Sequence, residues 1–456
     1  MTTTQLDAPR RDDLATMEPP QLPVPLPRLR RALKHPRVMH HNRLAALVLV
    51  ANLGALVLGL ADGWWASDGV AVGTISDVVL ANFALAILVR QQYVINLLFW
   101  LATRAPTTWP LRVRWTLAKV YHFGGLHVGG ALAGTLWFLA LVGAEIYHVA
   151  RGLPGVTVPT MIVSCALVAV LVGMAVMARP SYRARAHDTF ERMHRFGGWT
   201  ALGMFWAATV LAVLGQRGDR SAALALLQAP DIWVLLLLTF SIALPWLRLR
   251  RVPITIERPS THVAVVRFEH GRKPFAGSST AISRNPLREW HSFANVPSPD
   301  QDGFRLTISR AGDWTGKFID DAPSHVWVKG ITTAGVANIE TLFTRVVYVA
   351  TGSGIGPVLP HLLEGQVPSH LVWATRDPRT TYGDALVEEI LAVQPGATIF
   401  DTAKHGKPDM VQMAYEAYVA FGAEAVICIS NKQLTWRVVH GLEERGIPAY
   451  GAIWDS

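Results

Sequence analysis

Six long apolar segments in the first half of the chain restrict the folds that it can adopt. Each approaches the roughly 20 residues that an α-helix needs to cross about 30 Å of hydrocarbon, although the last is short. The segments are 44–61, 70–89, 120–142, 156–178, 196–214 and 232–247. With 51% hydrophobic and only 16% charged residues, the chain is too apolar for an ordinary soluble protein. We therefore expect a polytopic α-helical membrane domain with six spans over residues 44–250.

Basic residues cluster on alternate connections between these segments. The connection 62–69 contains no Lys or Arg, whereas 90–119, 179–195 and 248–258 each contain several. Loops rich in Lys and Arg stay on the cytoplasmic side of a membrane. We therefore expect a multi-pass protein of the cell (inner) membrane, in contact with the lipid bilayer and with both termini in the cytoplasm. Because the arginines flank apolar runs, the net charge of +9 does not indicate a nucleic-acid partner.

The N-terminal 43 residues are rich in proline and charge. They lack the short apolar core of a signal peptide, and we expect disorder up to about Pro27 followed by a basic stretch. The two cysteines, Cys165 and Cys428, each lie in an apolar run. They offer neither a disulfide framework nor a cysteine-based metal site.

From Val252 onward the composition is that of soluble domains. The runs 262–268, 303–309 and 325–331 have β character with turn residues between them, which predicts a small antiparallel β-barrel over 251–343. Strand and helix patterns then alternate over 344–456, which predicts a doubly wound α/β domain. The expected strands are 346–351, 370–375, 397–401, 424–430 and 448–454, and the expected helices are 357–364, 383–393, 408–420 and 434–445.

A glycine-rich turn, ATGSGIGP, follows the first strand of this α/β pattern at 350–357. Gly352, Gly354 and Gly356 allow a tight turn and a close approach to a phosphate. Pro357 suits the first turn of a helix, whose positive end favours a pyrophosphate. A turn without a ligand is the alternative, but the alternating pattern behind the turn favours a dinucleotide site.

The order of these parts resembles the ferric reductase and NADPH oxidase superfamily from about residue 40 to the end. WHSFANV at 290–296 is similar to the flavin motif of that superfamily, and AGDWTGKF at 311–318 is similar to its FAD pyrophosphate segment. The turn at 350–357 matches its nicotinamide nucleotide loop. The resemblance implies FAD and NAD(P)H as cofactors.

The resemblance also implies roles for individual residues. It implies flavin contacts by His291, Ser292 and Phe293, FAD phosphate contacts by Gly312, Trp314, Thr315 and Gly316, and NAD(P) pyrophosphate contacts by Gly352, Gly354, Ile355, Gly356 and Pro357. Trp454 is the candidate aromatic that covers the flavin, with a core tryptophan as the alternative. Arg376 follows the second α/β strand, where it either pairs with a 2′-phosphate of NADPH or faces solvent.

The chain departs from the superfamily where hydride passes to the flavin. The expected Cys-Gly-Pro reads Ile429, Ser430 and Asn431, and Cys428 is displaced by one residue, which turns it to the other face of a strand. Ser430 and Asn431 are the remaining candidates to position a nicotinamide. Such departures resemble a divergent branch of transmembrane flavoproteins from fungi and some bacteria, often linked to regulation or to adenylate-forming enzymes of secondary metabolism.

Histidines in the expected spans allow one haem b at most. Haem-bearing members pair histidines about fourteen residues apart, but fourteen residues beyond His122 and His194 stand Leu136 and Ala208. His194 with either His122 or His127 could ligate an inner haem, with nearby glycines leaving room for the macrocycle. The alternative is that these histidines bind lipid phosphates and the glycines let helices pack.

The sequence therefore predicts a membrane flavoprotein oxidoreductase that passes electrons from NAD(P)H through FAD to a membrane-associated or cytoplasmic acceptor. A quinone or another small molecule could be that acceptor. The alternative is a nucleotide-sensing or scaffolding membrane protein with weak turnover, which the absence of Cys-Gly-Pro permits.

Overall fold

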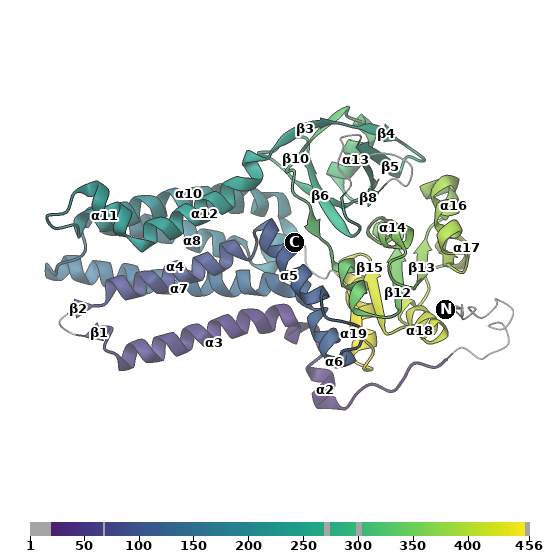
Figure 1. The fold of residues 1–456 in the computed structure, drawn as a ribbon, viewed down its shortest axis with the longest axis horizontal. Coiled ribbons are helices and arrows are strands. Elements are labelled where there is room, and N and C mark those ends of the chain that lie inside the picture. The colour runs from purple at the N-terminus through teal and green to yellow at the C-terminus, as the bar shows by residue number, and fades with distance from the viewer. Residues whose placement is uncertain (1–19, 67–68, 269–273, 298–302, 452–456) are drawn as a thin grey trace.

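A computed structural model describes residues 20–66, 69–268, 274–297 and 303–451 of the chain. A bundle of long helices occupies one end of the molecule, and three β-sheets with shorter helices occupy the other (Figure 1).

The long helices coincide with the expected apolar segments. They are α3 (His40–Ala61), α4 (Val72–Leu88), α7 (Gly124–Arg151), α8 (Val158–Met177), α10 (His187–Gly215) and α12 (Pro230–Leu247). Among the described residues, five helices are long and apolar enough to cross a membrane. The helix α4 reaches that length only together with α5 (Gln92–Thr103), from which it bends by 75°. The six predicted helices are thus confirmed, and their insertion into a membrane stays a prediction.

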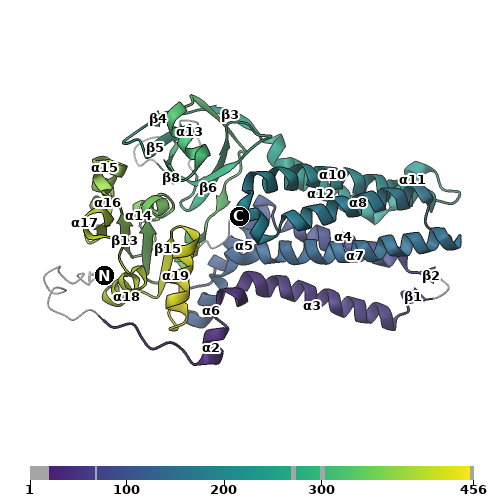
Figure 2. The same ribbon diagram turned by 180° about the vertical axis from the view of Figure 1, so that it is seen from behind.

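The helix α7 packs closely against α3 and α4 (Figure 2). A Cβ atom at Gly130 would lie 2.8 Å from the Asn82 carbonyl oxygen of α4, so the small residue lets the two helices approach. The amides of Asn52 and Asn82 hydrogen-bond to each other, and the Trp137 indole donates to Asn52 Oδ1 at 2.9 Å. These contacts satisfy the polar groups between α3, α4 and α7.

Shorter elements connect the long helices. They are α2 (Arg28–Ala32), η1 (Pro36–Val38), β1 (Trp65–Ala66), β2 (Gly69–Val70), α6 (Leu111–Leu117), η2 (Val120–Phe123), α9 (Pro180–Arg185) and α11 (Ala222–Gln228). The expectation of disorder up to Pro27 is wrong for residues 20–27. Leu22 packs against the α/β domain, and the Leu26 N–H donates to the Glu444 carbonyl at 2.8 Å. Apolar burial and backbone hydrogen bonds therefore hold this proline-rich segment in place.

Two antiparallel sheets follow the bundle. One contains β11 (Thr333–Ala334), β6 (Ser278–Ser283), β10 (His325–Val328) and β3 (Arg250–Pro253), with β7 (His291–Ala294) paired to β6; the other contains β4 (Thr255–Glu257), β5 (Val263–Phe268), β9 (Phe304–Ser309) and β8 (Val296–Pro297). Both sheets and α13 (Asp313–Asp321) enclose one core that includes Ile282, Leu306 and Phe318. No ladder joins the two sheets within the described residues, so the closed barrel that we expected is not confirmed.

The last domain is the predicted α/β layer. Its parallel sheet has the order β14 (Thr398–Asp401), β13 (Ser369–Thr375), β12 (Val346–Thr351), β15 (Ala425–Ile429) and β16 (Ala449–Tyr450). Its helices are η3 (Val336–Leu342), η4 (Gly352–Gly354), α14 (Ile355–Glu364), α15 (Pro378–Tyr382), α16 (Asp384–Val393), α17 (Thr402–His405), α18 (Met410–Phe421) and α19 (Lys432–Glu443). The strand order reverses between β12 and β15, and this switch point is where such sheets bind ligands.

The α6 helix fixes the α/β domain to the bundle. The Arg114 guanidinium, which is 5% exposed, makes two hydrogen bonds to the Glu424 carboxylate at 2.7 and 3.0 Å and one to the Leu342 carbonyl at 2.8 Å. Glu424 also accepts the Thr344 N–H at 2.8 Å. These hydrogen bonds, with Arg114 first, lower the pKa of Glu424.

We expect Glu424→Gln to destabilise this junction by about 2 kcal/mol, because the buried guanidinium loses its charged partner. Arg112→Ala, which truncates an exposed arginine on the same helix, serves as the control and should be nearly neutral. A depressed carboxyl pKa stabilises the fold above the unfolded-state pKa and loses that effect as the pH falls through the folded-state value. The difference in Tm between wild type and Glu424→Gln should therefore shrink below about pH 4.5. A Tm difference that stays constant at lower pH would contradict a lowered pKa of Glu424 in the folded protein.

Candidate nucleotide and flavin site

The glycine-rich turn lies at the switch point of the parallel sheet. After β12 ends at Thr351, Gly352 adopts a φ of +49°, which favours glycine. A Cβ at Gly354 would lie 1.9 Å from the carbonyl oxygen of Ile429, so the turn and the end of β15 touch through their backbones. Helix α14 begins at Ile355, two residues earlier than predicted, and its first turn includes Gly356 and Pro357. The predicted nucleotide loop thus stands at the expected crevice.

Ser430 and Asn431 differ in their surroundings at the end of β15. The Ser430 hydroxyl hydrogen-bonds to the Thr351 hydroxyl at the end of β12, so the two side chains meet at the crevice. Asn431 instead caps α19, because its Oδ1 accepts the Leu434 N–H at 3.0 Å. Cys428 is fully buried in the core, and burial raises its pKa to about 12. Ser430 therefore presents its hydroxyl at the crevice, while the Oδ1 atom of Asn431 is occupied by the helix cap.

Strand β9 of the antiparallel domain approaches the same turn. A Cβ at Gly356 would lie 3.5 Å from the Thr307 carbonyl oxygen. The buried Thr307 hydroxyl has no hydrogen-bond partner among the described residues. The sequence analysis missed Thr307, although a threonine within an apolar strand was a signal for it. The crevice therefore lies between the two C-terminal domains.

The predicted flavin residues only partly come together. The rings of His291 and Trp314 stack with centroids 3.9 Å apart, and Phe293 lies 6.3 Å from Trp314. Ser292 is exposed, since successive residues of a strand point to opposite faces. Nε2 of His291 and Nε1 of Trp314 are buried and have no partner among the described residues. Burial lowers the pKa of His291, which favours the neutral imidazole.

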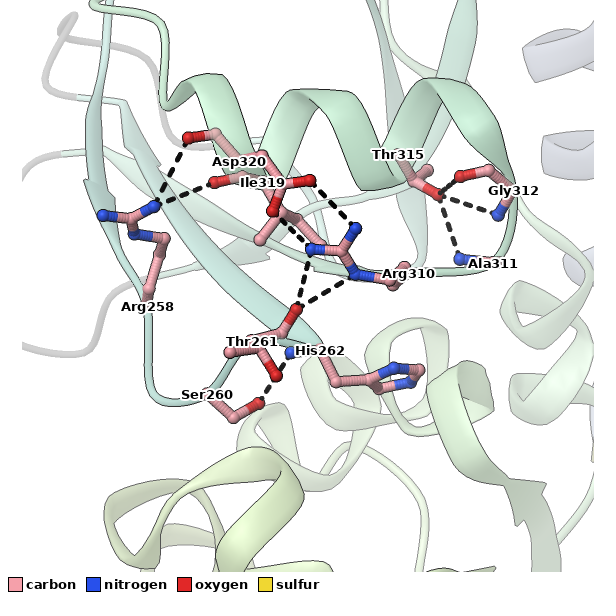
Figure 3. Close-up of polar contacts among 10 residues, drawn as sticks. All are labelled: Arg258, Ser260, Thr261, His262, Arg310, Ala311, Gly312, Thr315, Ile319 and Asp320. Atoms are coloured by element: carbon pink, nitrogen blue, oxygen red, sulfur yellow. Dashed lines mark hydrogen bonds and ion pairs between the residues drawn. The ribbon is translucent and has the colours of Figure 1, made fainter.

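The segment expected to hold the FAD phosphates forms a helix cap. The N–H groups of Ala311 and Gly312 both donate to Thr315 Oγ1, at 3.0 and 3.1 Å, and that hydroxyl donates to the Gly312 carbonyl (Figure 3). The Gly316 N–H also donates to the Gly312 carbonyl, at 2.9 Å, so the expected phosphate donors of Gly312, Thr315 and Gly316 are already paired. Trp314, also expected at the phosphates, instead lies against the flavin-contact strand.

A hollow of about 460 Å³ lies beside this cap. It is lined by Arg310, Gly312, Asp313, Gly316, Lys317 and Asp320. The Arg310 guanidinium pairs with the Asp320 carboxylate and also donates to the Thr261 carbonyl at 3.0 Å (Figure 3). Acidic and basic side chains both line the hollow, and Arg310 is already paired with Asp320. A phosphate in the hollow would therefore lie next to Lys317.

The outer end of the parallel sheet carries Arg376 and an acidic neighbour. Arg376 is exposed after β13. Asp401 ends β14, and its carboxylate accepts the Asp377 N–H at 2.9 Å, the hydrogen bond that contributes most to lowering its pKa. In related folds a carboxylate binds the ribose hydroxyl, whereas an arginine accommodates the 2′-phosphate, and this edge has both groups. Trp454, the candidate to cover the flavin, lies outside the described residues.

The candidate haem ligands do not form one group. His127 and His194 approach each other with ring centroids 6.1 Å apart, whereas His122 stacks on His40. The described residues contain no group of three or more His, Cys, Asp or Glu side chains that could hold a metal ion. The backbones of neighbouring helices fill the space beside some of the glycines that were expected to leave room for a macrocycle. A Cβ at Gly125 would lie 2.0 Å from the His41 carbonyl oxygen, and one at Gly129 would lie 2.9 Å from that of Ala45.

Comparison with known proteins gives named relatives. Residues 336–456 match the family described as Adenylate-forming reductase 03009, C-terminal domain. Adenylate-forming reductase 03009 of Coprinopsis cinerea is 40% identical over 430 residues, and Adenylate-forming reductase 06235 of the same fungus is 38% identical over 431 residues. Each alignment covers 94% of this chain and 41% of the relative. The chain thus spans about two fifths of the length of these relatives.

Solved structures with a similar arrangement include ferredoxin-NADP+ reductases. One from Neisseria gonorrhoeae with bound FAD and NADP has a TM-score of 0.37 and 13% identity, and covers 45% of this chain and 98% of that structure. One from Plasmodium falciparum with 2′P-AMP has a TM-score of 0.35 and 12% identity. This match covers 45% of this chain and 95% of that structure.

The relatives named here are adenylate-forming reductases and not ferric reductases. The expected link to adenylate-forming enzymes is therefore confirmed, while the ferric reductase and NADPH oxidase likeness stays a hypothesis. The chain is similar to adenylate-forming reductases over about two fifths of their length.

Proposed function

We propose that the chain is an NAD(P)H-dependent flavin oxidoreductase. The observation that carries this proposal is the crevice between β12 and β15, where Gly354 touches the Ile429 backbone and the Thr351 and Ser430 hydroxyls meet. The glycine turn brings the start of helix α14 to the place where a pyrophosphate would bind. The hydroxyl pair beside it offers a donor and an acceptor to the carboxamide of a nicotinamide.

The aromatic residues of the antiparallel domain fit a flavin. His291, Phe293 and Trp314 form a wall of rings, and two of their nitrogens are buried with no partner in the described part of the chain. Buried polar atoms normally have hydrogen-bond partners, so these two favour a bound polar ligand. FAD, when bound, supplies the acceptance of hydride and the release of electrons. The chain contributes orientation and a neutral imidazole.

We further propose that the helical bundle lies in the cell membrane, with both C-terminal domains on its cytoplasmic side. The apolar lengths of the helices and the Arg-rich connections support this location. The acceptor would be a membrane-associated or cytoplasmic small molecule, such as a quinone. Because its relatives are named for adenylate formation and reduction, we propose that this chain supplies reducing equivalents in a pathway that also forms adenylates.

We expect Gly354→Ala to abolish or weaken nucleotide binding while flavin is retained. The new Cβ collides with the Ile429 carbonyl, so the turn must shift away from its phosphate-binding geometry. The detergent-purified protein is titrated anaerobically with NADPH while flavin absorbance is followed. The NADPH concentration that gives half of the absorbance change should rise at least about tenfold, equivalent to about 1.4 kcal/mol of binding free energy. Gly396→Ala is the matched control, because nothing lies within 4 Å of its added Cβ.

The wild-type protein in the same titration tests the proposal itself. Flavin that copurifies but stays oxidised with NADPH would contradict the enzyme and favour the nucleotide-sensing or scaffolding alternative. Protein that cannot be loaded with FAD would overturn the flavin site. A single haem held by His127 and His194 is a separate hypothesis, and a b-type absorbance lost in His194→Ala would support it.

We expect Ser430→Ala to slow hydride transfer about tenfold, the effect of losing one positioning hydrogen bond. Cys428→Ala should leave the rate unchanged, because Cys428 is buried inside the sheet, whereas Ser430 follows the end of β15 and meets Thr351 at the crevice. Single-turnover measurement of flavin reduction by NADPH gives both rates. Equal slowing in the two variants would show that general perturbation of β15, not contact with the nicotinamide, explains the effect.

A further inference from the structure

The helix α5 departs from the expected topology. The sequence analysis treated 90–119 as a basic cytoplasmic connection, but Gln92–Thr103 forms a helix that turns 75° away from α4. With only 12 residues, α5 is too short to cross a bilayer. It lies where the bundle meets the C-terminal domains (Figure 1).

One face of α5 binds the C-terminal domains. The Asn96 side chain donates to the Thr332 carbonyl and accepts the Ala334 N–H, each at 2.9 Å. One turn earlier, the Gln92 amide donates to the Ile331 carbonyl at 3.3 Å. On the same side, Phe99 is buried in the core that extends into the parallel sheet. This face is therefore fully engaged with protein.

The opposite face of α5 is apolar and exposed. It consists of Tyr93, Leu97, Trp100 and Leu101, followed by Arg104. Each of the first four residues is between 47 and 56% exposed. These positions are spaced by three or four residues and therefore form one stripe. The Arg104 guanidinium lies 4.7 Å from the Trp100 ring centroid. Tyr, Trp and Arg beside leucines are the residues that favour the boundary between headgroups and acyl chains.

A contact with the bundle fixes the depth of this stripe. The Arg248 guanidinium donates to the Tyr93 hydroxyl and lies 5.3 Å from the Tyr93 ring centroid. Arg248 directly follows α12, which ends at Leu247, and α5 directly follows α4, which ends at Leu88. The stripe therefore begins at the level where two apolar helices end. A bend of 75° from a moderately tilted span leaves α5 nearly parallel to the bilayer plane.

We propose that α5 lies in the plane of the membrane interface, with its Tyr93–Arg104 stripe inserted at the headgroup boundary and its opposite face carrying the flavin domain. The lipid interface is the partner of this stripe. The proposal rests on the membrane location proposed above. In this placement α5 holds the two C-terminal domains at a fixed height above the bilayer, because Asn96 and Gln92 bind the segment that joins those domains.

Site-directed spin labelling of the full chain in lipid nanodiscs tests this placement. In a background with Cys165→Ser and Cys428→Ala, single labels replace Leu97 and Leu101 on α5. Labels at Leu53 and Val57 on α3 are lipid controls, and a label at Val419, which is 45% exposed on α18, is the water control. The measured quantity is collision with oxygen relative to a polar paramagnetic complex, which reports depth.

We expect Leu97 and Leu101 to report equal, shallow depths and a severalfold higher oxygen preference than Val419. Leu53 and Val57, one turn apart on a spanning helix, should differ in depth by about 6 Å. A water-like signal at Leu97, together with lipid-like signals at Leu53 and Val57 on α3, would overturn the proposal for α5 and leave the membrane location intact. Spin–spin broadening at Leu97 would show that a second copy covers the stripe, which also overturns it. Water-like signals on α3 would overturn the membrane location, and the placement of α5 with it.

Discussion

A buried ion pair determines how the α/β domain sits on the bundle. Lys119, between α6 and η2, pairs with Glu443 at the end of α19, and both residues are less than 9% exposed. The Trp115 indole donates to the same carboxylate at 3.0 Å. Burying two charges is costly unless further hydrogen bonds satisfy them, and a pair of this kind tolerates few alternative arrangements. Together with Arg114 and Glu424, the pair specifies one docking geometry.

The same short connection organises the whole molecule. Residues 89–123 carry α5 against the junction of the two C-terminal domains and α6 against the α/β domain. The Tyr450 hydroxyl donates to the Trp115 carbonyl at 3.2 Å, which brings the last described strand to the bundle as well. A movement of the nucleotide crevice relative to the helices would have to break several buried contacts at once. The C-terminal half is therefore built as a fixed attachment and not as a freely tethered domain.

Much of this fold could be predicted because its periodicities are strong. The central strands β12 and β15 are apolar runs, and β12 has the predicted bounds of 346–351. The docking of α5 could not be predicted, because its face is chosen by partners more than 200 residues away in the chain, such as Thr332. At the site, the exposure of Ser292 follows from the two-residue period of a strand and was predictable. The capping roles of Asn431 and Thr315 depend on local backbone geometry that residue type alone leaves open.

The contact between Gly354 and Ile429 also explains which side chain of β15 can serve the crevice. Because the Gly354 backbone rests on the Ile429 carbonyl, β15 cannot slip by one residue without a collision. Cys428 lies within β15, whereas Ser430 follows Ile429, the last residue of that strand. The register therefore places Ser430 beside Thr351 and keeps the thiol in the core. Under the proposed function, this register offers the nicotinamide a pair of hydroxyls and no thiol from β15.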